Sequence, residues 1–467
     1  MSINLEKLNE LWGQATYEEC PDFSTPLGPV CIDTRSLIEG SFFVPLIGER
    51  FDGHEFLPEA FSKGAQAAVV SKKSKLKIPS KFLHWVVEDT LDAYQQLALL
   101  HRRNLRVPVI AITGSVGKTT TREMIKEILK PLGLITSTQN NNNNDIGVPL
   151  TLFQADLDNA AVVVEMAMRG FGEIERLSRC TEPDIAVITN IGNAHIGRLG
   201  SRRNIAIAKC EITTNLKSTG VVIIPAYDQL LEEVLNDCWN GRILKIGIKN
   251  YFPEHIENCL DHLPLKDQDV DFQGDFSVID SLLKVEDTIF KVPFGGMHNA
   301  MNFMLALGVA KELGMNLSQI PKLNIQTPSG RNCSLNIGGI TVLDETYNSS
   351  PESVIASMKL LVARPGRHFA VLGAMRELGE HSFSFHCQIA ELAIDLSLDG
   401  LIFIGDGVES EAMSIAAKSL QTFKVVSSIE ESFKYLISWL IPGDTVLLKA
   451  SRSVELEGLI PLLKNFL

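Results

Sequence analysis

The stretch VIAITGSVGKTTTREM, Val109 to Met124, joins an apolar run to a glycine-rich turn and then to a helix-forming segment. Glycines let the backbone N–H groups of such a turn face an anion, and the N-terminus of the following helix adds positive potential. Lys118 is placed to neutralise phosphates, and the hydroxyl of Thr119 is placed to reach Mg²⁺. The stretch therefore predicts a nucleotide-binding turn, with a strand–helix connection that holds Gly, Lys and Thr by chance as the alternative.

The spacing of this turn differs from the common pattern G-x-x-x-x-G-K-[ST]. Five residues before Gly117 the sequence has Ile112, and the upstream glycine is Gly114 instead. The turn therefore has the shorter form TGSVGKTT, from Thr113 to Thr120. This form is either a degenerate nucleotide loop or a loop type of its own.

Apolar runs that alternate with helix-like segments extend from the turn towards both ends of the chain. Buried strands linked by helices are typical of parallel sheets covered on both faces, so we predict an α/β fold. The predicted strands are residues 107–113, 160–168, 184–191 and 220–227 around the turn, residues 42–45, 67–70 and 83–87 before it, and residues 340–347, 367–375, 399–407 and 444–451 after it.

The length of the chain, 467 residues, suggests about three domains. We place one boundary after residue 105, where a helix predicted over 88–105 ends, and one after residue 328, within the turn-forming sequence NIQTPSGR (324–331). Residues 251–295 are irregular and acidic, which suggests a strand excursion, and a helix is predicted over 296–314. The predicted domains are residues 1–105, 106–328 and 329–467.

The composition is that of a globular protein without a large excess of basic residues. Apolar residues make up 45% of the chain, charged residues 21%, and the net charge is −13, which disfavours non-specific binding to nucleic acid or anionic lipid. The eight cysteines form no C-x-x-C pair, so we expect reduced cysteines and no zinc site. Because we find neither a signal-like N-terminus nor an apolar run of membrane-spanning length, we expect a cytoplasmic protein.

Four further features are candidates for a functional role, and two of them stand at the ends of predicted strands. Glu165 closes a predicted strand, where a carboxylate is placed to bind a metal, although a solvated glutamate is the simpler alternative. His195 follows the next strand, and a single histidine is usually just a polar surface or core residue. Lys209 lies in a predicted helix, where a single lysine is nearly always solvated. The asparagines at 140–144 favour neither helix nor strand, and they suit either a plain loop or contacts with ligand hydroxyls and phosphates.

Taken together, these segments resemble the Mur ligase family across all three predicted domains. The family's loop has the short form T-G-[ST]-x-G-K-[ST]-[ST], which TGSVGKTT matches. Further matching segments, specific in their order and spacing, are NNNNDIGVPLTLF, AVITNIGNAH, IAIAKCEI, GMHNAMN, SGR, DETYNSSPESV, ELGEHS and KASR. The resemblance implies a small α/β UDP-binding domain, a central P-loop ATPase-like domain with a parallel sheet, and a C-terminal Rossmann-like domain.

The same resemblance gives roles to the matching positions of this sequence. It implies an ATP and Mg²⁺ site in which Lys209 is carbamylated, so that the added carboxylate supports a metal. The implied metal ligands are Thr119, Glu165, His195 and Lys209, and the implied catalytic residues are Lys118, Glu165, His195, Lys209 and Arg331. The implied ATP contacts are Gly114, Ser115, Gly117, Lys118, Thr119 and Thr120 at the phosphates, Asn299 and Asn302 near the adenine, Arg331 at the γ-phosphate and Asp344 at the ribose.

The resemblance also assigns substrate positions. DTRSLIEGSFFVPLIGERFDGHEF (33–56) resembles the family's UDP-binding domain. DETYNSSP resembles the D-D-A-Y-N-A-N-P motif of the branch that adds D-alanyl-D-alanine, and the D-N-P-R motif of the diaminopimelate-adding branch is missing. Ala374 in LGAMRELG stands where the first branch has an acid, a difference that bears on acceptor binding. The implied substrate contacts are Arg35, Ser36, Asn141, Asn143, Asn144, Tyr347 and Asn348.

The implied activity is ATP-dependent ligation of D-alanyl-D-alanine to UDP-N-acetylmuramoyl-tripeptide through an acyl phosphate, in peptidoglycan synthesis, by a monomer whose domains close before chemistry. The nearest alternative is another ligase of the superfamily, of the diaminopimelate-adding or folylpolyglutamate synthase type. The UDP-type first domain disfavours the folate enzyme. A P-loop protein that binds ATP without ligation is the second alternative, which the matches at His195, Lys209, Arg331 and Asp344 disfavour.

Overall fold

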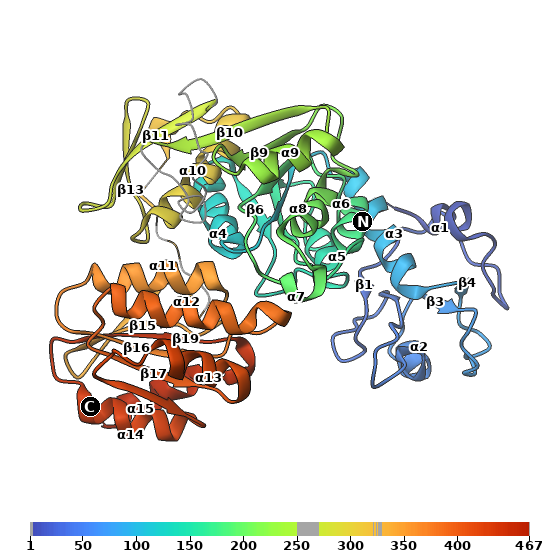
Figure 1. The fold of residues 1–467 in the computed structure, drawn as a ribbon. Helices are drawn as coiled ribbons and strands as arrows, with labels where there is room; N and C mark the ends of the chain where they lie inside the picture. The colour runs from blue at the N-terminus through green and yellow to red at the C-terminus, as the bar shows by residue number, and fades with distance from the viewer. Residues whose placement is uncertain (1–2, 250–269, 321, 324, 326–328, 467) are drawn as a thin grey trace.

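The computed structural model describes residues 3–249, 270–320, 322–323, 325 and 329–466. The described chain forms three separate sheets flanked by helices (Figure 1), which confirms the predicted α/β fold with three sheet-containing parts. The predicted irregular segment lies outside the described residues over 251–269, as does most of the predicted linker before residue 329. The two domain boundaries stay predictions.

The central sheet has nine strands in the order β13-β12-β11-β10-β9-β8-β5-β7-β6. The strands from β6 to β11 are parallel, and β12 and β13 add an antiparallel edge. In the sheet, β6 and β7 lie on one side of β5, and β8 lies on the other. The connections of the chain therefore change direction at β5, and in such sheets ligands bind at the carboxyl ends of the strands where this change occurs. The strands are β5 (Val109–Thr113), β6 (Leu134–Ser137), β7 (Asn159–Glu165), β8 (Ile185–Ile188), β9 (Val221–Pro225), β10 (Arg242–Ile248), β11 (Phe272–Ser277), β12 (Leu282–Val285) and β13 (Thr288–Lys291).

Alternate residues of β5 explain how this sheet is covered on both faces. Ile110 and Ile112 belong to one apolar core with the helices α4 and α10, whereas Val109 and Ala111 belong to a second core with α5, α6, α8 and α9. Successive strand residues point to opposite faces, so an unbroken apolar strand needs helices on both. The helices of this part are α4 (Lys118–Leu129), α5 (Gly147–Phe153), α6 (Glu173–Thr181), α7 (Ile196–Leu199), α8 (Arg202–Cys210), α9 (Gln229–Cys238) and α10 (Met297–Glu312).

The N-terminal sheet is small and wholly parallel, in the order β1-β2-β3-β4. A long helix connects it to the central part, because Arg102 near the end of that helix donates to the Thr181 carbonyl over 2.7 Å and to Asp184 Oδ2 over 2.7 Å. The elements are β1 (Val30–Cys31), β2 (Phe42–Phe43), β3 (Ala67–Ser71), β4 (His84–Val87), α1 (Leu5–Trp12), α2 (Leu57–Ser62) and the long helix α3 (Thr90–Asn104).

The C-terminal sheet has the order β14-β15-β19-β16-β17-β18, with β14 antiparallel at one edge and the other strands parallel. Helices α11 to α13 cover one face, and α14 and α15 cover the other. The elements are β14 (Cys333–Ile337), β15 (Ile340–Glu345), β16 (His368–Gly373), β17 (Gly400–Ile404), β18 (Phe423–Val426), β19 (Thr445–Lys449), α11 (Pro351–Val362), α12 (Ser382–Asp395), α13 (Gly407–Ala416), α14 (Ile429–Trp439) and α15 (Leu459–Phe466).

The predicted strands are all present, but most are shorter than predicted. The strand predicted over 160–168 ends at Glu165, for example, because the chain then turns away towards α6. Sequence patterning missed five strands because they are short or only partly buried, and these are β1, β6, β10, β14 and β18. The excursion suggested for residues 251–295 is confirmed over its described part by β11 to β13.

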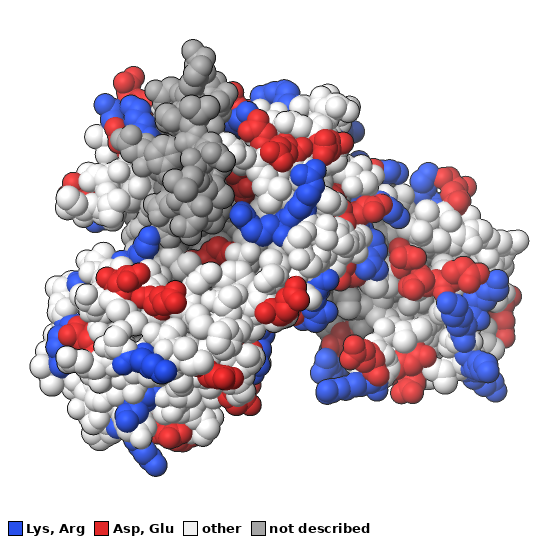
Figure 2. Space-filling model, viewed as in Figure 1, with Lys and Arg blue, Asp and Glu red and all other residues white. Residues whose placement is uncertain are grey.

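Two surface features complete the description. On the face drawn in Figure 2, basic and acidic side chains are interspersed over all three parts of the molecule, as on an ordinary solvated surface. Among the helices of the described ranges, none combines the length and the apolar character that a membrane crossing requires.

Candidate functional site

The turn between β5 and α4 adopts a conformation that requires its glycines. Gly114 has φ 147° and Gly117 has φ 85°. A Cβ atom on Gly114 would lie 1.9 Å from Thr189 Oγ1, and one on Gly117 would lie 2.6 Å from Asn302 Oδ1. Left-handed backbone and close packing together exclude other residues, so the turn is a tight backbone cradle.

The loop after β8 holds this cradle in place. Ser115 N–H donates to the Asn190 carbonyl over 3.1 Å, and Val116 N–H donates to Asn190 Oδ1 over 3.1 Å. In return, Gly192 N–H donates to Ser115 Oγ over 2.9 Å. Three hydrogen bonds to the loop after β8 therefore fix the backbone that would face a phosphate.

Lys118 supplies the positive charge of the cradle. Its Nζ donates to the carbonyls of Gly114 and Ser115 over 2.8 and 3.1 Å. Burial lowers the pKa of Lys118 to about 8; the Glu165 charge opposes this shift, and the Arg331 charge adds to it. A lysine whose charge is disfavoured in the free protein gains from an arriving anion, as a phosphate-binding lysine must.

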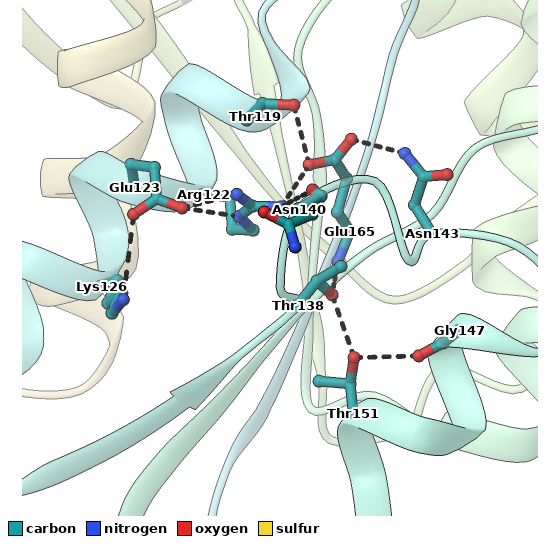
Figure 3. Close-up of polar contacts among 10 residues, drawn as sticks. All are labelled: Thr119, Arg122, Glu123, Lys126, Thr138, Asn140, Asn143, Gly147, Thr151 and Glu165. Carbon is teal, nitrogen blue, oxygen red and sulfur yellow. Dashed lines mark hydrogen bonds and ion pairs between the residues drawn. The ribbon is translucent and has the colours of Figure 1, made fainter. Parts of the chain in front are cut away.

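Glu165 lies at the end of β7 at the centre of a buried polar cluster (Figure 3). Its Oε2 accepts from Thr119 Oγ1 and from Arg122 Nη1, both over 2.9 Å, and its Oε1 accepts from Asn143 Nδ2 over 2.8 Å. Glu165 and Thr119 offer a carboxylate and a hydroxyl beside the phosphate cradle, which are the hard oxygen donors that Mg²⁺ prefers. Within the described ranges, no three His, Cys, Asp or Glu side chains gather as a metal cage, so this donor pair fits an ion completed by phosphate and water.

The asparagine run lies against this cluster through two different kinds of contact. The Asn140 carbonyl accepts from Arg122 Nη1 over 3.0 Å, and Asn143 binds Glu165. Asn144 Oδ1 instead accepts from Gly147 N–H over 3.0 Å at the start of α5, and Asn141 is exposed. The run is an ordered turn rather than a plain loop, and it brings the side chain of Asn143 to Glu165.

His195 and Lys209 approach the same region from the loop and helix that follow β8. His195 has φ 68°, and its Nδ1 forms a hydrogen bond with Glu377 Oε2 of the C-terminal part. Burial lowers the pKa of His195, although Glu377 opposes the shift. Lys209, on α8, is 2% exposed and has neither a hydrogen bond nor an ion pair within the described ranges. Burial, together with the charge of Lys118, holds the pKa of Lys209 well below its usual range.

The C-terminal part meets the cradle through residues that follow the linker. Asn332 Nδ2 donates to Thr120 Oγ1 over 3.3 Å, and Asn299 Nδ2 donates to Asn332 Oδ1 over 3.3 Å. The Arg331 guanidinium lies 3.8 Å from the centre of the Tyr347 ring, a stacking contact that orients it. Arg331 is thus held on the C-terminal part while its charge acts on Lys118.

Three family models match the chain. The Mur ligase family catalytic domain matches residues 29–118, the Mur ligase middle domain matches residues 112–310, and the Mur ligase glutamate ligase domain matches residues 332–452. A protein of Synechocystis sp. named UDP-N-acetylmuramoyl-tripeptide--D-alanyl-D-alanine ligase is 37% identical over 436 residues, covering 92% of this chain and 90% of its own.

The chain belongs to the Mur ligase family. Solved structures agree with this assignment. MurF from Acinetobacter baumannii matches with a TM-score of 0.85 at 28% identity, covering 99% of this chain and 98% of its own. MurF from Thermotoga maritima in complex with ADP matches with a TM-score of 0.79 at 28% identity, covering 94% and 97%.

Three further residues were predicted to contact the nucleotide, and all three are buried: Asn299, Asn302 and Asp344. Asn299 and Asn302 are buried on α10, with Asn302 against Gly117. Asp344 is buried and accepts from Gly330 N–H over 3.2 Å and from Thr346 Oγ1 over 2.7 Å. The Asp344 carboxylate therefore already accepts hydrogen bonds that hold the start of the C-terminal part. A ribose hydroxyl that contacted Asp344 would have to share the carboxylate with these donors.

Tyr347 and Asn348 lie beyond β15 on the side of Arg331. Lys449 Nζ donates to the Asn348 carbonyl over 3.1 Å and lies 3.8 Å from Glu345 Oε2. Burial lowers the pKa of Lys449 against the charge of Glu345, and burial raises the pKa of Glu345. Ala374 is buried at the end of β16, where its N–H donates to the Ile404 carbonyl over 3.2 Å.

Arg35 and Ser36 are not brought to the cradle by any contact of the described residues. The Arg35 side chain is 88% exposed and pairs with Asp33 over 2.6 Å, which with its hydrogen bonds lowers the pKa of Asp33 to about 2. Ser36 Oγ donates to the Asp33 carbonyl over 3.0 Å. Both residues lie on an exposed loop of the N-terminal part.

Sequence patterning missed several residues of this site. Arg122 follows Thr119 by three positions, and this spacing places both side chains on one face of α4. The spacing was the one feature of the sequence that could have indicated that Arg122 belongs to the site. Glu377 and Glu352, which both contact the loop after β8, stand inside quoted family segments, but only the packing of two domains brings them to that loop.

Proposed function

We propose that this Mur ligase joins D-alanyl-D-alanine to UDP-N-acetylmuramoyl-tripeptide with ATP, yielding UDP-N-acetylmuramoyl-pentapeptide, ADP and phosphate for peptidoglycan synthesis. The observation that carries the proposal is that the C-terminal part meets the P-loop of the central part, where Asn332 donates to Thr120 and the charge of Arg331 acts on Lys118. This arrangement suits an enzyme that moves the γ-phosphate to a carboxylate between two domains. The relatives that bear this ligase name, among them a Bacillus subtilis protein 34% identical over 93% of this chain, support the choice of substrates.

The reaction has two steps. A carboxylate oxygen of the tripeptide attacks the γ-phosphorus of ATP, the bond from that phosphorus to the ADP oxygen breaks, and an acyl phosphate forms. The amine of D-alanyl-D-alanine then attacks the acyl carbon, a C–N bond forms, and the C–O bond to the phosphoryl group breaks.

Repulsion between carboxylate and triphosphate is the main barrier that this site must lower. Lys118 binds and orients the phosphates from the cradle, and Arg331 reaches the γ-phosphate from the C-terminal part. Thr119 and Glu165 would hold a Mg²⁺ ion, which supplies further positive charge at the transferring phosphoryl group when bound. Packing of the C-terminal part over the cradle excludes water from the acyl phosphate.

Lys209 is proposed to be carbamylated. Only an uncharged amine adds to CO₂, in the reaction R-NH₂ + CO₂ → R-NH-COO⁻ + H⁺, and burial without a partner favours the uncharged amine. The product is an oxygen ligand in place of a cation. With His195, this group would support a second Mg²⁺ ion beside the γ-phosphate.

The remaining proposals concern the substrate contacts, the oligomeric state and the location of the protein. Asn299 and Asn302 would contact adenine and Asp344 the ribose, Asn141, Asn143, Asn144, Arg35 and Ser36 the UDP-sugar, and Tyr347 and Asn348 the acceptor. A monomeric state and a cytoplasmic location, where ATP is made available, remain part of the proposal.

Phosphate release tests the proposal directly. We expect release from ATP only when UDP-N-acetylmuramoyl-tripeptide and D-alanyl-D-alanine are both present. Release with diaminopimelate or lysine in place of the dipeptide would overturn the choice of acceptor. ATP binding without release under any of these conditions would favour a binding protein without ligation.

A further inference from the structure

Glu352 joins two domains at the edge of the phosphate cradle. It lies in the first turn of α11, in the C-terminal part, and its Oε1 accepts from Asn193 N–H and from Asn193 Nδ2, both over 2.6 Å. Asn193 belongs to the loop after β8, two residues before His195. One oxygen of this carboxylate is therefore fully used in a contact between domains.

The second oxygen of Glu352 is buried and lacks a partner. Oε2 accepts no hydrogen bond within the described ranges, and Glu352 forms no ion pair there with Lys, Arg or His. The donors to Oε1 are uncharged amide groups, so none of them neutralises the negative charge of the Glu352 carboxylate. A buried carboxylate oxygen with no donor is costly, which indicates that a ligand supplies the donor.

The position of this oxygen relates it to the reacting groups. A Cβ atom on Gly192 would lie 2.8 Å from Glu352 Cδ and 3.1 Å from Oε2, so glycine is what lets the carboxylate approach. The N–H of the same Gly192 donates to Ser115 Oγ in the cradle. The carboxylate therefore packs directly against a residue that binds the phosphate loop.

We propose that Glu352 Oε2 binds the ammonium group of the acceptor dipeptide and takes its proton before the amine attacks. An ammonium group provides both the cation and the N–H donors that Oε2 lacks. The inference rests on the proposed function, for which no residue of this chain has yet been given the task of deprotonating the acceptor.

The proton and bond changes balance as follows. R-NH₃⁺ gives one proton to the Glu352 carboxylate and becomes R-NH₂, whose nitrogen lone pair forms the C–N bond to the acyl carbon. The C–O bond to the phosphoryl group breaks, and the second nitrogen proton leaves with the phosphate as HPO₄²⁻. Glu352 afterwards returns its proton to solvent.

A contact that only holds the two domains together is the competing explanation of the same geometry. Such a contact would serve both half-reactions equally, because Arg331 and the cradle must meet for the first step also. An acceptor-binding carboxylate acts only in the second step. The two half-reactions must therefore be measured separately.

Hydroxylamine separates them, since it is largely uncharged at neutral pH and traps an acyl phosphate as a hydroxamate without needing a base. Wild-type enzyme, Glu352→Gln and Asn193→Ala would be given ATP, Mg²⁺ and UDP-N-acetylmuramoyl-tripeptide, with either hydroxylamine or D-alanyl-D-alanine. For Glu352→Gln we expect hydroxamate formation within about twofold of wild type and kcat/KM for the dipeptide lower by about a hundredfold. Glu391→Gln, on the exposed side of α12, is the surface control and should match wild type in both assays.

Asn193→Ala removes the side-chain donor to Oε1, leaves the backbone N–H donor in place and keeps the charge of Glu352. We expect it to reduce dipeptide ligation much less than Glu352→Gln does. Equal losses of hydroxamate and ligation in Glu352→Gln, equal behaviour of the two variants, or undiminished ligation by Glu352→Gln would each overturn the inference. Absence of ligation by the wild-type enzyme would instead overturn the proposed function.

Discussion

The guanidinium of Arg122 donates from Nη1 to Glu165 Oε2 over 2.9 Å, and the side chains of both residues are almost fully buried. Arg122 also donates to the Asn140 carbonyl over 3.0 Å and pairs with Glu123 over 2.5 Å. One arginine thus connects the helix after the cradle, the asparagine run and the carboxylate proposed to hold Mg²⁺ (Figure 3).

Removing one partner of this buried pair should destabilise the enzyme strongly. Arg122→Met leaves Glu165 as a buried charge without its cation, and we expect unfolding free energy to fall by about 3 to 5 kcal/mol. Urea unfolding measures this. In the double variant Arg122→Met/Glu165→Gln, position 165 no longer holds a buried charge, so much of the lost stability should return, and a purely additive result would contradict the pairing.

Gly117 and Gly172 allow a matched test of the cradle. Both are N-caps with left-handed backbone, φ 85° and 77° and ψ −10° in each, but a Cβ atom meets Asn302 Oδ1 at 2.6 Å only at Gly117; at Gly172 nothing lies within 4 Å. Replacement by alanine should cost each protein a similar backbone strain of about 1 kcal/mol. Only Gly117→Ala should also weaken ATP binding, by at least about tenfold, as measured by calorimetric titration. Equal ATP affinity in the two variants would show that the cradle tolerates a side chain.

The sequence could predict those parts of the site that local chemistry determines. The cradle follows from a buried strand, two glycines and a helix start, and Glu165 lies beside it because parallel strands present their carboxyl ends at one edge. Arg122 could not be placed, because an arginine on a helix is usually solvated, and its burial here depends on where the asparagine run turns.

Contacts between domains lie beyond local patterning. No periodicity within α11 marks Glu352 as facing Asn193, and no feature of the loop before α12 marks Glu377 as facing His195. These contacts depend on how two separately folded sheets meet. The short strand β1 was missed for a related reason, since two half-buried residues carry no alternation and their pairing comes from the rest of the sheet.

Replacing Lys209 should strongly reduce the activity of the enzyme. Lys209→Ala removes the proposed carbamate, so we expect phosphate release to fall by about a hundredfold or more and to recover in part when formate or acetate is added. Lys217→Ala is the control, because Lys217 is partly exposed and pairs with Asp184 away from the cradle. A fully active Lys209→Ala variant, measured without added carboxylate, would exclude the carbamate.

His298, in the first turn of α10 in the central part, gives the enzyme a pH dependence. Burial, with a smaller contribution from the positive charge of Lys449, lowers the pKa of His298 from 6.5 to about 4. Between these values the unfolded chain binds a proton at this position that the folded chain does not, so the free energy of unfolding must fall as the pH falls from 6.5 towards 4.

His298→Gln should remove this contribution. Between pH 6.5 and about pH 5 the wild-type enzyme should lose about 2 kcal/mol more unfolding free energy than the variant, since each pH unit is worth about 1.4 kcal/mol for one proton. Urea unfolding of both proteins across this range, with a pair of measurements at pH 7.5 to fix the effect of the substitution itself, gives the difference. Parallel pH profiles would mean that His298 accepts a proton as readily in the folded enzyme as in the unfolded chain.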